Sequence, residues 1–252
     1  AFAILLVGQQ KVTGGTNGLN GFRSFFGYDL ADPVNKEMLY LMAAGTLLGR
    51  VFRWRVPARW YVFAIACIPA VELAAALAHR LVAGTWPRFG QTPWYAMAMA
   101  LPVSTWVQGG EEVGWRGYAL PRLSVRFGLA GGSVILGIVW ALWHLPLFFV
   151  LRGDTLGQSF PLYLLQVTAL SVAAAWLYWR TGGSLLLVML LHAAVNNTRD
   201  IVISAVLGAT NPWALSTSLA AWLTVGLLWI PAAYFLVRMR GTRAVLPASG
   251  ER

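Results

Sequence analysis

Apolar runs long enough to cross a lipid bilayer recur along this chain of 252 residues. A helix needs about 20 consecutive apolar residues to cross about 30 Å of hydrocarbon. Six runs meet or approach this length, at residues 60–82, 92–107, 129–151, 160–179, 184–207 and 213–237. A seventh run, at residues 38–52, is shorter and is interrupted by Gly45, Gly49 and Arg50. The sequence therefore predicts an all-α fold, a polytopic membrane bundle of about six to seven transmembrane helices.

The composition also indicates a membrane protein. Hydrophobic residues make up 58% of the chain and charged residues only 11%, whereas soluble domains carry about 25% charged residues. The formal net charge of +10 is almost entirely due to Arg. Because these Arg residues stand singly or in small groups between apolar runs, we interpret them as membrane-flanking charges and expect no nucleic-acid partner. Cys67 is the single cysteine, so no disulfide can form within the chain.

The Arg residues are divided unequally between the two sides of the expected bundle. Twelve fall on one side: Arg50, Arg53, Arg55, Arg59, Arg116, Arg122, Arg126, Arg180, Arg238, Arg240, Arg243 and Arg252. Four fall on the other side: Arg80, Arg88, Arg152 and Arg199. The positive-inside rule places the Arg-rich side and the C-terminus in the cytoplasm. We expect an integral protein of a bacterial plasma membrane, with the lipid bilayer as its partner and residues 241–252 as a basic cytoplasmic tail.

Residues 1–50 differ from the rest of the chain. Five Gly residues punctuate a polar stretch, which is typical of loops. The sequence V-T-G-G-T-N-G-L-N-G-F, from Val12 to Phe22, resembles the glycine-rich loop of branched-chain amino acid and urea ABC-transporter permeases. We interpret residues 1–50 as an atypical Gly-rich segment, fused or truncated, and residues 51–240 as the helical bundle.

Ionisable side chains inside a bilayer are costly, so each one is a candidate functional residue. Most of them belong to three patterns, E-E-V-G-W-R-G at 111–117, W-A-L-W-H at 140–144 and H-A-A-V-N-N at 192–197. On a helix, residues four apart share one face. This spacing pairs Glu112 with Arg116, Trp140 with His144, and His192 with Asn196. Glu111 is rotated by about 100° from Glu112, so its carboxylate is predicted to point elsewhere.

A carboxylate, two imidazoles and an amide can together hydrolyse a peptide bond. Glu111 is the candidate base, with His144 orienting the attacking water and moving its proton. His192 and Asn196 are candidate donors to the developing negative oxygen. No Ser or Cys stands at a comparable position beside a base, so the sequence gives no support to covalent catalysis.

In this order and inside apolar runs, the three patterns resemble the CPBP family of intramembrane proteases, which includes the type II CAAX prenyl endopeptidases and bacteriocin-processing enzymes. The resemblance covers about residues 50–240. The family motifs E-E-x-x-x-R, F-x-x-x-H and H-x-x-x-N are matched except that Trp140 stands in place of Phe. The resemblance implies an endopeptidase acting on a membrane-associated peptide or protein. It assigns water activation to Glu111 with His144, oxyanion stabilisation to His192 with Asn196, and supporting roles to Glu112, Arg116 and Trp140.

The resemblance leaves the cofactor open. The family is customarily called metalloprotease, and Glu111, His144 and His192 are acceptable zinc ligands. The compact spacing H-E-x-x-H is absent from the sequence. A metal-activated water and a glutamate mechanism without a metal are therefore both kept as hypotheses.

Each candidate residue also has a purely structural interpretation. Glu112 and Arg116 could form a neutralising pair near the membrane interface, His144 could bind a carbonyl freed by Pro146, and Asn196 with Asn197 could join helices. For the whole chain, the alternatives are a transporter or permease component and a catalytically inactive scaffold.

Helix lengths raise a geometric difficulty. In the expected spans, Glu111 lies near the cytoplasmic end, whereas His144 lies about 22 Å from that face at 1.5 Å per residue. Straight parallel helices would keep these side chains apart. We expect tilt, a longer helix through the glutamate pair, or a third span that begins nearer Val134.

Overall fold

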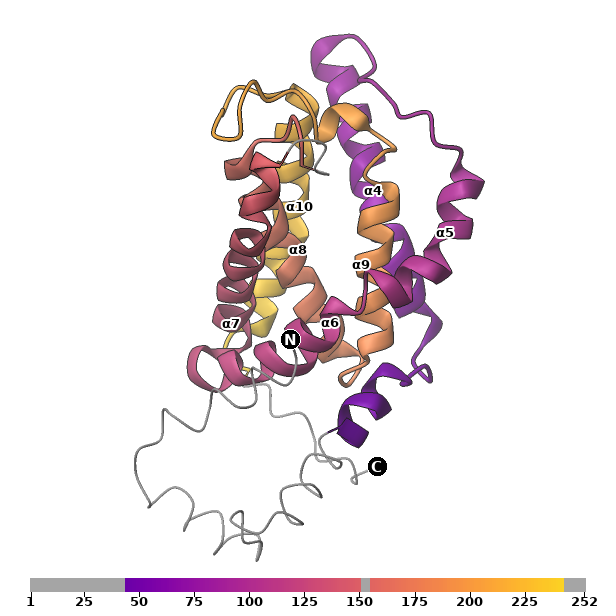
Figure 1. Cartoon of the computed structure of the whole chain (residues 1–252), viewed down its shortest axis with the longest axis vertical. Helices are drawn as coiled ribbons and strands as arrows, with labels where there is room; N and C mark the ends of the chain where they lie inside the picture. The colour runs from indigo at the N-terminus through magenta and orange to yellow at the C-terminus, as the bar shows by residue number, and fades with distance from the viewer. Residues whose placement is uncertain (1–43, 151–154, 243–252) are drawn as a thin grey trace, which may run out of the picture. The chain divides into compact units, whose positions relative to one another are not determined.

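A helical bundle makes up the part of the chain that the computed structural model describes, residues 44–150 and 155–242. Its elements are α4 (Ala58–Ala83), α5 (Trp94–Val107), α6 (Glu111–Gly114), the π-helix η2 (Trp115–Ala119), α7 (Leu120–His144), the 3₁₀ helix η3 (Leu145–Phe149), α8 (Phe160–Arg180), α9 (Leu185–Thr198), the 3₁₀ helix η4 (Ile203–Ala205) and α10 (Leu219–Met239). No strand occurs in these ranges. Helix α8 packs against α7 and α10, whereas α9 packs against α4 and α5 (Figure 1).

The chain divides into two units, residues 1–49 and residues 50–252. In the first unit only residues 44–49 are described, and they are helical. The permease-like stretch and the rest of the Gly-rich segment lie outside the described residues. So does most of the predicted basic tail, from residue 243 onward.

Four stretches of the described chain are long and apolar enough to cross a membrane. They are Ala58–Ala83, Glu111–Phe149, Phe160–Arg180 and Leu219–Met239. The predicted all-α, polytopic membrane fold is thus confirmed. The runs at 92–107 and 184–207 instead give α5 and α9, which have 14 residues each and are about 21 Å long.

Three predicted span boundaries are wrong, and local backbone chemistry explains each difference. The run at 129–151 becomes α7, which starts earlier, bends at the non-helical Gly128 and stops at His144 before Pro146. The run at 184–207 stays helical only to Thr198. The run at 213–237 begins its helix at Leu219, because the Ser218 hydroxyl accepts a hydrogen bond from the Ala221 N–H at 3.1 Å.

Small side chains let α7 and α8 approach closely. A Cβ atom at Gly137 would lie 2.7 Å from the Thr168 Cα atom and 2.9 Å from the Ser171 Cβ atom. One turn away, the Ser171 hydroxyl donates to the Ser133 carbonyl at 2.8 Å. This is the packing by small and hydroxyl residues that membrane helices use in place of a hydrophobic driving force.

The α7–α8 contact predicts an unequal response to two equal substitutions. Gly137→Ala adds a methyl group against backbone atoms of α8 and is expected to cost about 1–3 kcal/mol of folding free energy. Gly226→Ala in α10 places its methyl group where no atom lies within 4 Å, so we expect no loss of stability. Thermal unfolding of both variants in one detergent measures the difference, and equal melting temperatures would contradict the close approach.

Five of the described Arg residues lie at the two ends of the bundle that the sequence predicted for them. The start of α4 and the ends of α8 and α10 lie at one end of the bundle, the lower end in Figure 1. Arg59, Arg180 and Arg238 lie at this end. Arg80, in the last turn of α4, and Arg199, directly after α9, lie at the other end. The cytoplasmic assignment of the Arg-rich end stays a prediction.

Cysteine labelling tests that orientation. After Cys67→Ala removes the native thiol, Thr242→Cys just beyond α10 should react only when a membrane-permeant reagent is used on intact cells. Thr85→Cys, in the connection between α4 and α5, is the matched position at the opposite end and should react with an impermeant reagent. The reversed pattern would overturn the orientation.

Candidate active site

The first motif follows the short helix α5, with Glu112 buried and Glu111 exposed. After Val107 a turn at residues 108–110 leads into α6, where the Glu112 N–H donates to the Gly109 carbonyl at 2.9 Å. A Cβ atom at Gly109 would lie 2.8 Å from the Met189 Cβ atom of α9, so glycine allows this turn to press against the middle of α9. From Glu111 the chain continues through η2 into α7. A helix through the glutamate pair is found, as one of the three expectations had it, but it is broken at the non-helical Gly128 and does not run straight from Glu111 to His144.

Glu112 and Arg116 form the predicted pair, but deep in the bundle. Both residues have no exposed surface. Arg116 Nη1 lies 2.8 Å from Glu112 Oε1 and 2.8 Å from Oε2. Glu112 Oε1 also lies 2.8 Å from His192 Nδ1 on α9. The interpretation of an isolated neutralising pair near the interface is therefore wrong, because this carboxylate also holds a ring of the third motif.

Trp140 packs between the first and third motifs. The Arg116 guanidinium carbon lies 4.8 Å from the centre of the indole ring, and the His192 ring centroid lies 5.2 Å from it. Trp140 is 7% exposed. The larger ring in place of Phe is thus accommodated between a cation and an imidazole, which supports the local packing role given to it.

His144 ends α7 with one ring nitrogen engaged. Its Nδ1 atom lies 2.9 Å from the Trp140 carbonyl oxygen. A carbonyl oxygen can only accept, so Nδ1 carries the proton and Nε2 keeps its lone pair in the neutral ring. The structure thus gives His144 a hydrogen bond to the Trp140 carbonyl and not to the Leu142 carbonyl that Pro146 frees, and Nε2 is left available.

The two adjacent amides of the third motif face different surroundings. Asn197 joins helices, because its Oδ1 atom accepts from the Ser104 hydroxyl of α5 at 3.3 Å. Its Nδ2 atom donates to the Ala193 carbonyl at 2.8 Å. Asn196 lies with His192 on another face of α9 and lines a different cavity. Interhelical hydrogen bonding is therefore found for Asn197.

One cavity of about 280 Å³ brings the four predicted catalytic residues together: Glu111, His144, His192 and Asn196. Trp140 lines it as well. The cavity has room for several water molecules. Arg199, an ionisable residue beside a predicted span, lines it too, whereas the sequence did not single out the other polar lining residues: Gln108, Thr155, Gln158, Tyr163 and Gln166. Polar residues such as Gln166 inside a predicted span were the available signal.

Tyr163 also contacts a motif residue. The Tyr163 and His144 ring centroids are 5.8 Å apart, with Phe148 packed on the other side of Tyr163 at 5.2 Å. Helix α8 thus closes the cavity opposite α9 and supports the imidazole of His144.

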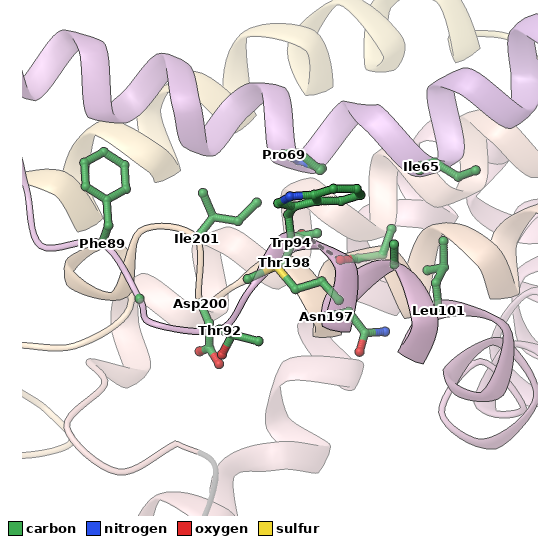
Figure 2. Close-up of a pocket in the computed structure, with 14 residues that line it drawn as sticks. Ile65, Pro69, Phe89, Thr92, Trp94, Leu101, Asn197, Thr198, Asp200 and Ile201 are labelled. Carbon is green, nitrogen blue, oxygen red and sulfur yellow. Dashed lines mark hydrogen bonds between the residues drawn. The ribbon is translucent and has the colours of Figure 1, made fainter.

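A second cavity, of about 470 Å³, lies on the other side of α9. Figure 2 shows Ile65, Pro69 and Leu101 around it, with Asn197 and Asp200 at its α9 side. None of the four predicted catalytic residues lines it. The predicted chemistry therefore belongs to the smaller cavity.

The described residues do not offer a ready metal site. Across residues 44–150 and 155–242, no group of three His, Cys, Asp or Glu side chains is arranged to hold a metal ion. Glu111, His144 and His192, named from the sequence as zinc ligands, line one cavity without forming such a set. We therefore derive no catalytic step through a metal.

Comparison with known proteins places the three motifs in one matched segment. Residues 90–198 match the family model of the type II CAAX prenyl endopeptidases, Rce1-like. A curated relative, CAAX prenyl protease 2 of Methanococcus maripaludis, is 31% identical over 98 residues. That alignment covers 36% of this chain and 36% of the relative, so the chain matches about a third of that protein's length. Over this segment, the resemblance drawn from the three motifs is confirmed.

Proposed function

We propose that this chain, whose residues 90–198 match the family model of the type II CAAX prenyl endopeptidases, is a membrane-embedded endopeptidase. The observation that carries the proposal is the single cavity lined by Glu111, His144, His192 and Asn196. These residues come from α6, α7 and α9, which are separated along the chain. Packing for stability alone does not require four polar side chains of such different chemistry to face one space.

Glu111 and His144 are assigned to the water. The Glu111 Oε2 atom accepts a hydrogen bond from Trp115 Nε1 at 3.3 Å, which orients the carboxylate. Among the described residues, no cation forms an ion pair with Glu111, in contrast to Glu112. The carboxylate can therefore take a proton from water, while His144 Nε2 accepts the second hydrogen bond of that water and positions it.

His192 and Asn196 are assigned to the oxyanion. His192 Nδ1 lies 2.8 Å from the Glu112 carboxylate, so Nδ1 carries a proton and donates it to that oxygen. A ring protonated on both nitrogens then has Nε2–H to donate, and the Asn196 amide supplies a second donor. The two imidazoles thus have different roles. His144 donates to the Trp140 carbonyl and is assigned to the water, whereas His192 contacts the Glu112 carboxylate and is assigned to the oxyanion.

The reaction that follows is hydrolysis without a covalent intermediate. Glu111 removes a proton from water as the water oxygen attacks the carbonyl carbon, and His192 with Asn196 stabilise the negative oxygen. The carbon–nitrogen bond then breaks as the proton held by Glu111 passes to the leaving nitrogen. The products are a carboxylic acid and an amine.

The proposal also includes a substrate class, which is taken from the name of the curated relative. The relative is named a CAAX prenyl protease, and we propose that a prenylated, membrane-associated peptide is the substrate of this chain. A quenched fluorogenic peptide is therefore offered to the purified protein in liposomes, with and without a prenyl group. Faster cleavage of the prenylated peptide supports this substrate class, whereas faster cleavage of the plain peptide replaces it with an unmodified membrane-associated segment.

Two neighbouring Asn residues provide a matched test of the oxyanion assignment. Asn196→Ala removes a donor from the cavity, and the hydrolysis rate is expected to fall by about 10²–10³. Asn197→Ala removes a bond between α5 and α9 without touching the cavity, so the rate should stay within a few-fold of wild type and only stability should fall. Rates are compared on the fluorogenic peptide. Equal rate losses in the two variants would remove the oxyanion role from Asn196.

A further inference from the structure

A basic cavity lies at the Arg-rich end of the bundle, remote from the three motifs. It has a volume of about 550 Å³ and forms between the segment that enters α4 and the turn from α8 to α9. Four of its lining residues are cations: Arg53, Arg55, Arg59 and Arg180. Four guanidinium groups around one cavity repel each other unless an anion lies among them.

Hydrogen bonds fix the two walls of the cavity to each other. Arg53 Nη1 donates to the Gly182 carbonyl at 2.8 Å. The hydroxyl of Ser184, which is buried at the start of α9, donates to the Arg53 carbonyl at 2.6 Å. Residues 53–57 are thus attached to the turn at 181–184. The cavity is part of the folded bundle and not a chance approach of surface chains.

Aromatic rings hold two of the cations in place. The Trp60 ring lines the cavity, with the guanidinium carbons of Arg59 and Arg180 at 5.5 and 5.7 Å from its centre. Arg180 also lies over the rings of Trp176 and Trp179, at 5.4 and 5.7 Å. Such stacking occupies the faces of a guanidinium group and leaves its N–H edge available for a planar or tetrahedral anion.

No described carboxylate neutralises this cavity. The acidic residues in the described part of the chain are Glu72, Glu111, Glu112 and Asp200. None of them lines the cavity, and Glu112 is already paired with Arg116. Within the described residues, the four Arg side chains therefore line one cavity without a protein counter-charge.

The position in the bundle indicates which anion fits. The cavity lies where α4 begins and α8 ends, which for transmembrane helices is the level of the lipid head groups. Tryptophan beside Arg is typical of this level. The phosphate of a lipid head group is held there by its own acyl chains, and guanidinium groups bind phosphate through paired hydrogen bonds. Basic pockets between transmembrane helices bind such head groups.

We propose that Arg55, Arg59 and Arg180, with Arg53 as a wall, form a binding site for the phosphate head group of an anionic phospholipid. Phosphatidylglycerol has this chemistry. The site binds lipid independently of the hydrolytic cavity and anchors the α4 and α8 ends at the membrane surface.

The test measures lipid binding to the full chain by native mass spectrometry from detergent. Phosphatidylglycerol is the probe, phosphatidylcholine is the neutral lipid control, and inorganic phosphate is the free-anion control. Arg55→Gln/Arg59→Gln/Arg180→Gln leaves the Arg53 hydrogen bond in place and is expected to weaken phosphatidylglycerol binding about 100-fold. Arg122→Gln/Arg126→Gln removes two cations outside this cavity and should leave binding within a few-fold of wild type.

Several outcomes would overturn the site. The triple variant could bind phosphatidylglycerol as tightly as wild type, or lose no more affinity than the control variant. Either result would show that the four Arg residues do not form a specific site. Equal wild-type affinity for the two lipids would remove the selectivity for an anionic head group. Inorganic phosphate that binds as tightly as the lipid would make the site one for a free anion. Because the wild-type lipid comparison needs no variant, misfolding of the triple variant would not leave the proposal undecided.

Discussion

Glu111→Gln is expected to reduce peptide hydrolysis to near background while the protein inserts and folds like wild type. The amide keeps the size of the side chain and can still accept the hydrogen bond from Trp115 Nε1. It cannot take a proton from water, and loss of a general base costs about 10²–10⁴ in rate. The rate on the fluorogenic peptide, with melting temperature recorded on the same samples, separates chemistry from folding.

Glu72→Gln is the matched control for that variant. Glu72 is a buried acid on α4, 3% exposed, and does not line the cavity of the four motif residues. The same change of carboxylate to amide at this position should leave the hydrolysis rate within a few-fold of wild type. Wild-type activity in Glu111→Gln, or equal losses in the two variants, would contradict the role given to Glu111.

Glu112→Leu is expected to cause the largest loss of stability of any single change in the site. The substitution leaves the guanidinium group of Arg116 buried with no exposed surface and without its counter-charge. Removing one partner of a buried ion pair costs about 3–5 kcal/mol. Low yield or a strongly lowered melting temperature should follow. Activity should be lost as well, because His192 Nδ1 loses the carboxylate that it contacts at 2.8 Å.

The double variant Glu112→Leu/Arg116→Leu separates these two effects. Replacing both charges with apolar groups removes the uncompensated cation, so much of the lost stability should return. Hydrolysis should stay low, since the partner of His192 is still missing. Arg122→Leu, which removes an exposed hydrogen bond to the Tyr118 carbonyl, serves as a surface control with little effect. A double variant less stable than Glu112→Leu would show that the pair itself stabilises the bundle.

The chemistry of the site could be predicted from the sequence because each motif is local. Residues four apart on a helix must share a face, so the Glu112–Arg116 pair and the neighbouring rings of Trp140 and His144 follow from spacing alone. Polar side chains are energetically unfavourable in a bilayer, so Glu111, His192 and Asn196 stood out as candidates among the many apolar residues. The structure brings all of them to neighbouring positions around one space.

Contacts between motifs could not be predicted in the same way. Glu112 and His192 are 80 residues apart, and their contact depends on the turn at Gly109 pressing against α9. Local spacing contains no information about that approach. The structural interpretation of Glu112 and Arg116 as an isolated pair accordingly left out His192, the second partner of Glu112.

Span boundaries were predicted less well than span existence, for a related reason. Apolar composition continues past the ends of α7 and α9, whereas Pro146 and the turn after Thr198 end the helices. The depth of Glu111 was misjudged because α5 was expected to cross the bilayer, and it has only 14 residues. The different roles of Asn196 and Asn197 could be told apart only from the relative positions of α5 and α9.

Mass spectrometry of the products formed in liposomes tests the central claim most directly, that Glu111 drives hydrolysis in the cavity it shares with His144, His192 and Asn196. Wild-type protein and Glu111→Gln are incubated with the same membrane-associated peptide under the same conditions. The account predicts that wild type yields two fragments whose masses together equal the peptide plus one water, and that Glu111→Gln yields neither above background. The same fragments formed by Glu111→Gln at the wild-type rate would contradict it.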